Sequence, residues 1–334
     1  MSPGHFRSAS RSVKVTALAT IAAVGLVAAP ASADTTMRVA HHLSPESDQH
    51  RAALRFKELV EDYSGGSVRV EVLPSAQMGG QREIIESVSL GTLEMGYGES
   101  GLYSNYVPEF GVLALPYLYR DLDHLEAVMT GSVGEELARR LADQAGMRIV
   151  NWINGGYRHT FLREEPVEVP ADFEGIKIRV PEAPVFVQTF AALGATPTPI
   201  PAPEIYTSLQ TGVVDAMEGS PETGVTFKVF EVTDYMSLTR HILLDGSFVV
   251  NQAFLDGLSE EDRAAVLRAA EEAGDEQRAG WNEVNEKWLA ELRDLGMTIN
   301  EVDVAPFQEA LADMQDEFAE SAGATDLLEE IRAE

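Results

Sequence analysis

Alternation between apolar and polar residues marks short strands along the chain, and helical periodicity marks the segments between them. Met37–Ala40, Val68–Val72 and Leu93–Gly98 have the two-residue period of strands. Residues 47–63 place apolar side chains three and four positions apart, which predicts an amphipathic helix, and residues 81–90 predict a second one. This succession of strand, helix and strand is typical of an α/β protein with a mostly parallel sheet.

The same pattern continues after a break in the middle of the chain. Met147–Trp152 predicts a strand, and Asn154-Gly155-Gly156 is the clearest breaker, where we place the first crossing between two domains. A second α/β unit follows, and we expect the chain to return to the first domain near residues 244–246. The pattern therefore predicts two discontinuous domains, residues 34–155 with 245–283 and residues 156–244 with 284–334.

A long helical pattern begins after residue 259. Ser259 is followed by Glu260, Glu261 and Asp262, which resembles an N-terminal capping box. The periodicity then runs to about Leu295. A helix of roughly 35 residues spans about 50 Å at 1.5 Å per residue, which is enough to bridge two domains.

The first 33 residues have the organisation of a secretory signal peptide. Three basic residues open the segment, an apolar run follows at Val15–Ala29, and Ala31-Ser32-Ala33 is an A-x-A cleavage site. A membrane anchor is the alternative, but the apolar run is short for a span of about 20 residues. We therefore expect an exported protein, with cleavage near Ala33.

Composition excludes several classes of protein. The chain has 54 acidic and 25 basic residues and a formal charge of −29, which argues against nucleic acid and anionic membranes as partners. It has no cysteine, so it has no disulfide, thiolate metal site or cysteine nucleophile. The excess of acid would suit a salty habitat or serve solubility alone.

The strongest candidate for a functional residue is Arg179. It alternates with apolar residues in Ile176–Val180, and Pro181 ends the strand because proline cannot donate to a ladder. Ligands of open α/β sheets bind at the carboxyl ends of strands. An arginine at that position offers a fork of donors that matches a carboxylate, although an ion pair is the alternative.

Further candidates lie at neighbouring edges of the predicted strands. Arg158 follows the glycine pair at the predicted crossing, where it would bind the ligand or form a hinge salt bridge. Glu99 ends a strand and would accept a hydrogen bond from a hydroxyl or amine of the ligand, or cap a helix. Aromatic residues near the same edges would form a platform for the ligand or belong to the core. They are Trp152, Tyr157 and Phe248.

Signatures of catalysis are missing from the sequence. There is no phosphate loop, no H-E-x-x-H motif, no dinucleotide-binding glycine pattern and no nucleophile elbow. His41 and His42 do not form a good metal pair, because adjacent residues of a strand point to opposite faces. We therefore expect a binding protein without cofactor or metal, and a secreted hydrolase or lyase is the alternative.

Several short motifs, in order along nearly the whole mature chain, carry a family resemblance. They are His41–Pro45, Gln77–Gly80, Leu113–Tyr117, Gly155–His159, Lys177–Val180, Gly194–Pro199, Glu204–Asp215 and Tyr235–Asn251. Each is weak alone, but in this order behind an export signal they are specific. The chain resembles the DctP-type substrate-binding subunits of tripartite ATP-independent periplasmic (TRAP) transporters.

The resemblance implies a fold, a partner and a site. It implies an α/β two-domain periplasmic-binding-protein fold with a hinge and a long helix across both domains. It also implies delivery of the ligand from the periplasm to the TRAP permease in the membrane, and we expect the protein to be a monomer. Arg179 matches the family arginine that clamps the ligand carboxylate, Arg158 matches a second arginine, and Glu99 lies where sialic-acid-type members carry a glutamate. His42, in the first motif, is a further ligand-binding candidate.

One departure from the family pattern concerns the ligand. Gly219 stands where many members have an asparagine that helps to hold the carboxylate, which would leave space for a bulkier ligand. Glu99 favours a hydroxylated or amino-bearing monocarboxylate, such as a sugar acid. A C4-dicarboxylate ligand, or a sensory role for the receptor, is the alternative.

Overall fold

The computed structural model describes residues 35–334 together with Met1 and Gly4, and the predicted signal peptide lies almost wholly outside the described residues. The strands are β1 Thr35–Ala40, β2 Val68–Leu73, β3 Met95–Gly98, β4 Met147–Leu162, β5 Lys177–Val180, β6 Thr196–Pro199, β7 Ala216–Gly219, β8 Tyr235–Asn251 and β9 Thr298–Glu301. The helices are α1 Asp48–Tyr63, α2 Gln81–Ser89, α3 Ser100–Tyr103, α4 Leu122–Thr130, α5 Ser132–Ala145, α6 Pro184–Ala192, α7 Ile205–Gln210, α8 Pro221–Thr226, α9 Gln252–Gly257, α10 Glu260–Asp294, α11 Ala305–Ala322 and α12 Thr325–Ala333.

Nine strands in the described part of the chain form one sheet, in the order β2-β1-β3-β8-β4-β7-β5-β6, with β9 beside β8. On one side β1 is parallel to β2 and β3, and on the other side β5 is parallel to β6 and β7. Between them the long strands β4 and β8 run antiparallel to each other. The α/β fold predicted from the sequence is confirmed, with a half on either side of the β4–β8 pair; below, the first half holds β1–β3 and the second holds β5–β7.

Both predicted crossings between the halves are strands rather than breaks. The sequence indicated a breaker at residues 154–156, yet β4 continues through it, with a register shift against β8 between Asn154 and Gly156. The predicted end of the strand after Trp152 was wrong, because a glycine pair also permits a β-bulge, in which the strand bends without ending. The return near residue 245 likewise lies inside β8. The exact domain boundaries remain a prediction.

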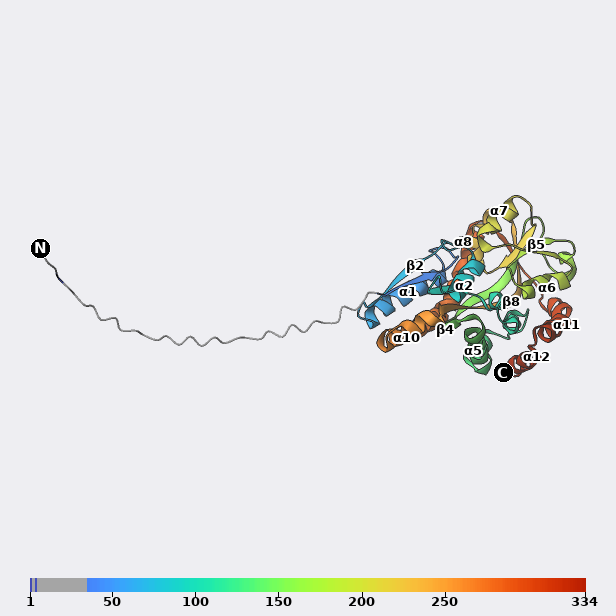
Figure 1. Cartoon of the computed structure of the whole chain (residues 1–334). Helices are drawn as coiled ribbons and strands as arrows, with labels where there is room; N and C mark the ends of the chain where they lie inside the picture. Colours follow the sequence, from blue (N-terminus) through green and yellow to red (C-terminus); the bar gives the residue numbers. More distant parts are fainter. Residues whose placement is uncertain (2–3, 5–34) are drawn as a thin grey trace. The chain divides into compact units, whose positions relative to one another are not determined.

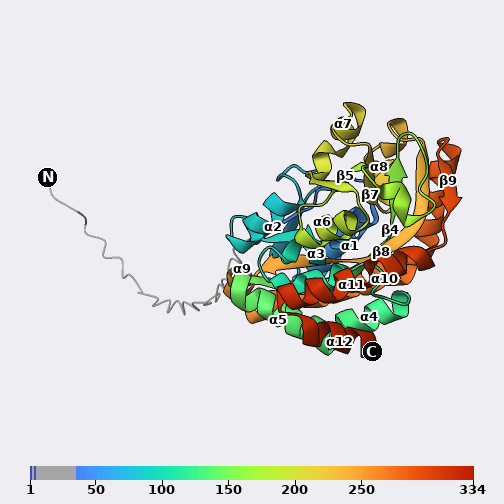
Figure 2. The same cartoon turned by 90° about the vertical axis from the view of Figure 1, so that its right-hand side faces the viewer.

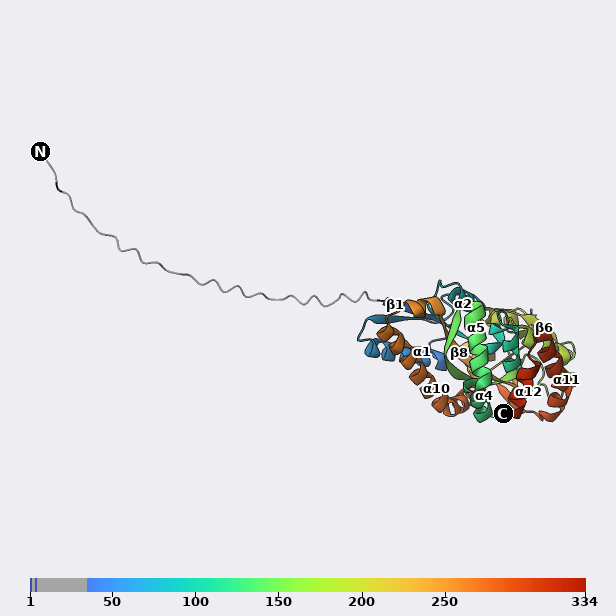
Figure 3. The same ribbon diagram turned by 60° about the horizontal axis from the view of Figure 1, so that its bottom comes forward.

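The predicted long helix is confirmed as α10, which has 35 residues. Ser259 is its N-cap, and the Ser259 hydroxyl accepts a hydrogen bond from the backbone N–H of Asp262. The helix packs against α1 in the first half, against β4, and against α8 in the second half (Figures 1 and 3). It therefore connects the halves, as its length predicted.

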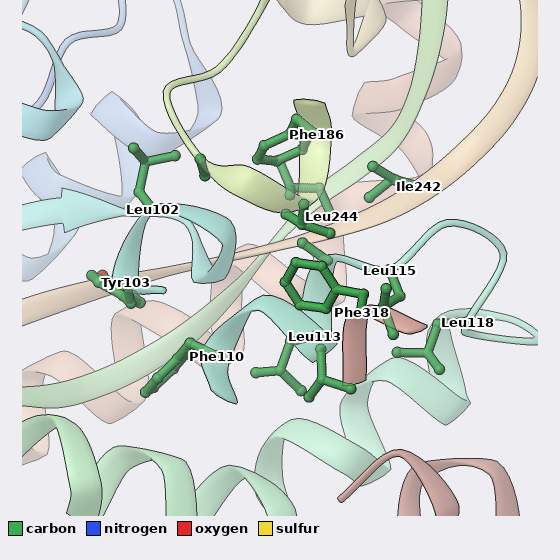
Figure 4. Close-up of a cluster of buried hydrophobic side chains, with 14 of the residues drawn as sticks. Leu102, Tyr103, Phe110, Leu113, Leu115, Leu118, Phe186, Ile242, Leu244 and Phe318 are labelled. Carbon is green, nitrogen blue, oxygen red and sulfur yellow. The ribbon is translucent and has the colours of Figure 1, made fainter. Parts of the chain in front are cut away.

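A hydrophobic core lies beneath the strands that join the halves. Leu102 and Tyr103 of α3, together with Phe110 of the short 3-10 helix Pro108–Ala114, meet side chains of α6, β8 and α11 (Figure 4). Figure 2 shows α11 between α6 and α12. Phe186 is one of the α6 residues in this cluster; it is fully buried and supports the polar site described next.

Candidate ligand-binding site

Two arginines lie on neighbouring parts of the sheet and are buried. Arg158 is in β4 and is 5% exposed, while Arg179 is near the end of β5 and is 4% exposed. Strand β7 lies between β4 and β5 and contributes Glu218, which is fully buried. The sheet order therefore brings together two cations and one carboxylate that are distant in the sequence.

Arg158 is held by Glu218. Its Nη2 donates to Oε1 of Glu218 at 2.6 Å, and its Nε donates to Oε2. His241 Nε2 lies 3.3 Å from the same Oε2, and the guanidinium of Arg158 lies 5.3 Å from the centre of the Phe186 ring. Burial alone would raise the pKa of Glu218, but Arg158 and His241 outweigh it and lower the pKa to about 2. Glu218 is therefore ionised and neutralises Arg158.

Arg179 has no such partner. Its Nε donates to the carbonyl oxygen of Ile200 at 2.7 Å, and its Nη nitrogens make no hydrogen bond or ion pair with any described residue. Burial is the main cause that lowers its pKa to about 10, and Arg158 acts in the same direction. Arg179 therefore keeps its charge at neutral pH, and its Nη N–H groups can donate hydrogen bonds to an anion.

The first half contributes polar groups to the same site. Glu99 follows β3, is 8% exposed, and has Oε2 at 3.7 Å from Nη1 of Arg158. Burial raises the pKa of Glu99, although Arg158 opposes that shift. Glu99 stands at the N-cap of α3, but its side chain makes no capping hydrogen bond. Its carboxyl is therefore turned to the arginines rather than to the helix.

His42 and Gln81 extend this polar surface. Burial, His41 and the two arginines lower the pKa of His42 to about 3, so its imidazole is neutral at physiological pH. Gln81 lies beside Glu99. Both Nδ1 of His42 and Nε2 of Gln81 are buried and have no hydrogen-bond partner among the described residues. Such groups are available to the hydroxyls of a ligand.

The other predicted site residues have different surroundings. Tyr157 is half-buried and lines a cavity of about 420 Å³ together with Asp121, Arg240 and Trp281. Trp152 is half-buried against the main core, and Phe248 is a core residue in edge contact with Tyr97. Trp152 and Phe248 therefore pack against the core, while Tyr157 also lines a cavity, and a role of these three side chains in ligand binding stays a prediction.

Gly219 does not face open space. A Cβ atom added to it would lie 2.7 Å from Cε of Met217 and 3.3 Å from Cβ of Thr223. The volume expected from the missing asparagine is therefore filled by neighbouring side chains. Glu218 was not predicted from the sequence. The feature that could have indicated it is a carboxylate within the otherwise apolar, buried strand β7.

The fold and the site together define the class of this protein. Two α/β halves joined by long strands, with a buried arginine where the halves meet, are typical of a periplasmic solute-binding protein. Residues 39–321 match the family described as bacterial extracellular solute-binding protein, family 7 (DctP), and the chain belongs to this family. No described helix is both long and apolar enough to cross a membrane.

Relatives and solved structures agree with this assignment. A solute-binding protein of Verminephrobacter eiseniae is 36% identical over 306 residues, which cover 91% of each chain. A TRAP periplasmic solute-binding protein of Roseobacter denitrificans, solved with β-D-glucuronate, is 31% identical with a TM-score of 0.86 and covers 89% of this chain and 99% of its own. One from Sulfurospirillum deleyianum, solved with succinate, is 27% identical with a TM-score of 0.86 and covers 90% and 99%. These proteins bind solutes for transport and are not enzymes.

Proposed function

We propose that this protein is a periplasmic receptor that holds a sugar acid or a similar hydroxylated monocarboxylate on Arg179 and delivers it to a TRAP permease. The observation that carries the proposal is the difference between the two buried arginines. Arg158 is neutralised by Glu218, whereas the Nη nitrogens of Arg179 have no partner among the described residues. A buried guanidinium needs an anion, and a carboxylate matches its planar fork of donors.

The charges around Arg179 favour a single carboxylate on the ligand. Arg158 and Glu218 cancel, so Arg179 leaves one positive charge for one ligand carboxylate. Glu99 lies 3.7 Å from Arg158, and a second ligand carboxylate beside it would meet a like charge or require protonation of Glu99. A C4-dicarboxylate is therefore the less favoured alternative.

The remaining polar groups favour hydroxyls on the ligand. Glu99 accepts hydrogen bonds when it is ionised, and His42 and Gln81 hold buried polar nitrogens without partners. These groups come from the first half, while Arg179 comes from the second. Among similar solved proteins, the bound acids include β-D-glucuronate, β-D-galacturonate and D-erythronate, which all carry hydroxyls.

Ligand capture would follow from closure of the two halves. Arg179 approaches the carboxylate from the second half, and Glu99, His42 and Gln81 approach the hydroxyls from the first. A ligand that contacts both halves only in the closed state shifts the population toward that state. The β4–β8 pair, with its bulges, is the place where the halves can rotate.

The direct test is a panel of acids measured by thermal shift and calorimetry. The panel contains D-glucuronate, D-galacturonate, L-galactonate and succinate. A hydroxylated monocarboxylate at 100 times its Kd should stabilise the protein by about 2.7 kcal/mol. Arg179→Ala should weaken binding by about 2–5 kcal/mol, because the ligand charge would then be buried unpaired.

The control for Arg179→Ala is Arg293→Ala, which removes an exposed arginine near the end of α10. Binding that survives in Arg179→Ala at wild-type affinity would contradict the clamp. Strong binding of succinate alone would replace the sugar-acid assignment by the dicarboxylate alternative.

Delivery is tested by uptake of the bound acid into proteoliposomes that contain the permease subunits, and the absence of uptake would favour a sensory role.

A further inference from the structure

A buried carboxylate connects the two halves at a second place. Glu222 follows β7 at the start of α8, in the second half, and is 7% exposed. Its Oε1 accepts a hydrogen bond of 2.6 Å from the backbone N–H of Asp48, the first residue of α1 in the first half. The contact joins residues that are 174 positions apart in the sequence.

The N-terminus of α1 is suited to receive a carboxylate from another element. The first N–H groups of a helix have no partner inside the helix, and the helix dipole places partial positive charge there. The Ser47 hydroxyl accepts from the N–H of His50, which leaves the N–H of Asp48 for Glu222. The side chain of Gln49 also faces Glu222, and Oε1 of Gln49 is buried without a partner.

A second contact at the other end of α8 links the same halves. The ring of Phe227, which follows α8, is stacked at 6.2 Å on the imidazole of His42. Both ends of α8 therefore contact the first half, one through a carboxylate and the other through an aromatic ring. These contacts depend on the halves being close together.

We propose that Glu222 is a latch of the closed state: its carboxyl group caps α1 across the interface between the halves and so stabilises closure over the bound acid. This inference rests on the proposed function, because the closed state has a role only if the two halves close over a bound acid. Glu222 is a positioning residue, since it acts through the arrangement of the halves and not through contact with the acid.

The latch has a dependence on pH that follows from its burial. Burial raises the pKa of Glu222 to about 7, while Gln49 and Arg51 oppose the shift. The charged groups that face it from α1 are Asp48 and Arg51, which form an ion pair with each other, and from β3 the buried phenol of Tyr97 lies near. When the halves separate, water reaches the carboxyl and its pKa returns toward its ordinary value near 4.5.

The sign of the effect follows from linkage. A pKa that is raised in the closed state means that closure favours the protonated carboxyl, so the closed state loses stability as pH rises from about 5 to about 7. Affinity for the acid should therefore be higher at pH 5.5 than at pH 8. Glu99 and Asp245 also have raised pKa values, so the informative quantity is the difference between wild type and a Glu222 variant.

The experiment measures Kd for D-glucuronate, D-galacturonate and L-galactonate at pH 5.5 and pH 8. The variants are Glu222→Ala, which removes the latch, and Glu222→Gln, which keeps an acceptor without a titrating proton. Glu231→Gln is the matched control, because it is an exposed glutamate in the same half. Glu222→Ala should weaken every acid by the same factor, about 10- to 100-fold at pH 5.5, and by less at pH 8, where ionisation of Glu222 already weakens closure. Glu222→Gln should flatten the pH dependence.

Two results would overturn the latch. Wild-type affinity in Glu222→Ala at both pH values would show that the contact contributes nothing to closure. A loss confined to one acid would make Glu222 a contact of the ligand instead. Unchanged melting of the ligand-free variants shows that they fold.

A readout without ligand separates failure of the latch from failure of the sugar-acid assignment. The chain has no cysteine, so Glu58→Cys in α1 and Val213→Cys, both exposed, give one labelled pair across the halves. Spin-label distances in the ligand-free protein should lengthen when Glu222→Ala is added. If no acid of the panel binds, equal distances with and without Glu222→Ala overturn the latch, and longer distances support it.

Discussion

The two buried arginines differ in their partners rather than in their own properties. Arg158 has a carboxylate in bidentate contact, while Arg179 uses only its Nε on the carbonyl of Ile200. Glu218 supplies this difference from the strand between them. A single carboxylate on β7 thus decides which arginine supports the structure and which one is available to an anion.

Removal of Glu218 should therefore destabilise the whole protein. Glu218→Ala removes the bidentate partner of the buried Arg158 and leaves only Glu99, at 3.7 Å, as a counter-charge among the described residues, and we expect a loss of about 3–5 kcal/mol in the free energy of unfolding. Urea denaturation at pH 7 measures it. Glu309→Ala removes an exposed glutamate of α11 as the control. An unchanged unfolding midpoint in Glu218→Ala would refute this structural role of the pair.

The same pair should be sensitive to acid. The pKa of Glu218 is lowered to about 2 in the fold, so its contribution is complete above its ordinary pKa and is lost as pH falls toward 2. The difference in unfolding free energy between wild type and Glu218→Gln should therefore shrink between pH 5 and pH 2. A difference that stays constant over this range would show that the charge of Glu218 is not the source of the stability.

Residue types predicted part of the site. The position of Arg179 could be predicted from the sequence, because a proline marks the end of its strand and ligands of open α/β sheets bind at strand ends. The pairing of Arg158 with Glu218 could not be predicted, because it depends on β7 lying between β4 and β5. The aromatic candidates could not be assigned either, since a strand neighbour faces the ligand or the core according to register.

At the level of elements, the bulges in β4 and β8 decide how the halves are connected. Gly156 has φ of +84°, and a Cβ atom there would lie 2.3 Å from the indole of Trp281 in α10. The glycine thus allows both the bend of β4 and the close approach of the long helix. The sequence marked the position correctly as special but did not distinguish a bulge from a strand end.

Gly156→Ala should be destabilising for two reasons. The left-handed backbone conformation disfavours alanine, and its methyl group collides with Trp281. We expect a loss of about 2–4 kcal/mol, measured by chemical denaturation. Gly280→Ala is the control, because no atom lies within 4 Å of its Cβ position in α10, and alanine favours helix there. Equal stability of both variants would contradict the role given to Gly156.

At the level of the whole molecule, charge opposes both folding and ligand capture. The chain has 54 acidic and 25 basic residues, while its ligand is expected to be an anion. Repulsion between exposed carboxylates is screened within about 8–10 Å at ordinary salt. In the proposed function Arg179 would act on the ligand at contact distance and in buried surroundings, where the attraction between charges is stronger than in bulk water.

Salt should therefore stabilise this protein. Raising NaCl from 10 mM to 300 mM weakens the repulsion between surface carboxylates, and we expect a rise of about 2–4 °C in melting temperature, which corresponds to about 1 kcal/mol. Calorimetry of the chain from residue 34 onward measures it. A melting temperature that falls with salt would mean that surface ion pairs outweigh the net repulsion.

The sequence by itself determined the alternation of helices and strands, the long helix α10, the excess of acidic residues and the position of Arg179 near the end of a strand, because these depend on local periodicity, capping and residue chemistry. Only the tertiary structure decided that β4 and β8 pass unbroken between the halves, that Glu218 neutralises Arg158, and that Glu222 reaches the start of α1. These features depend on strand order, register and the approach of residues far apart in the chain, which no local pattern encodes.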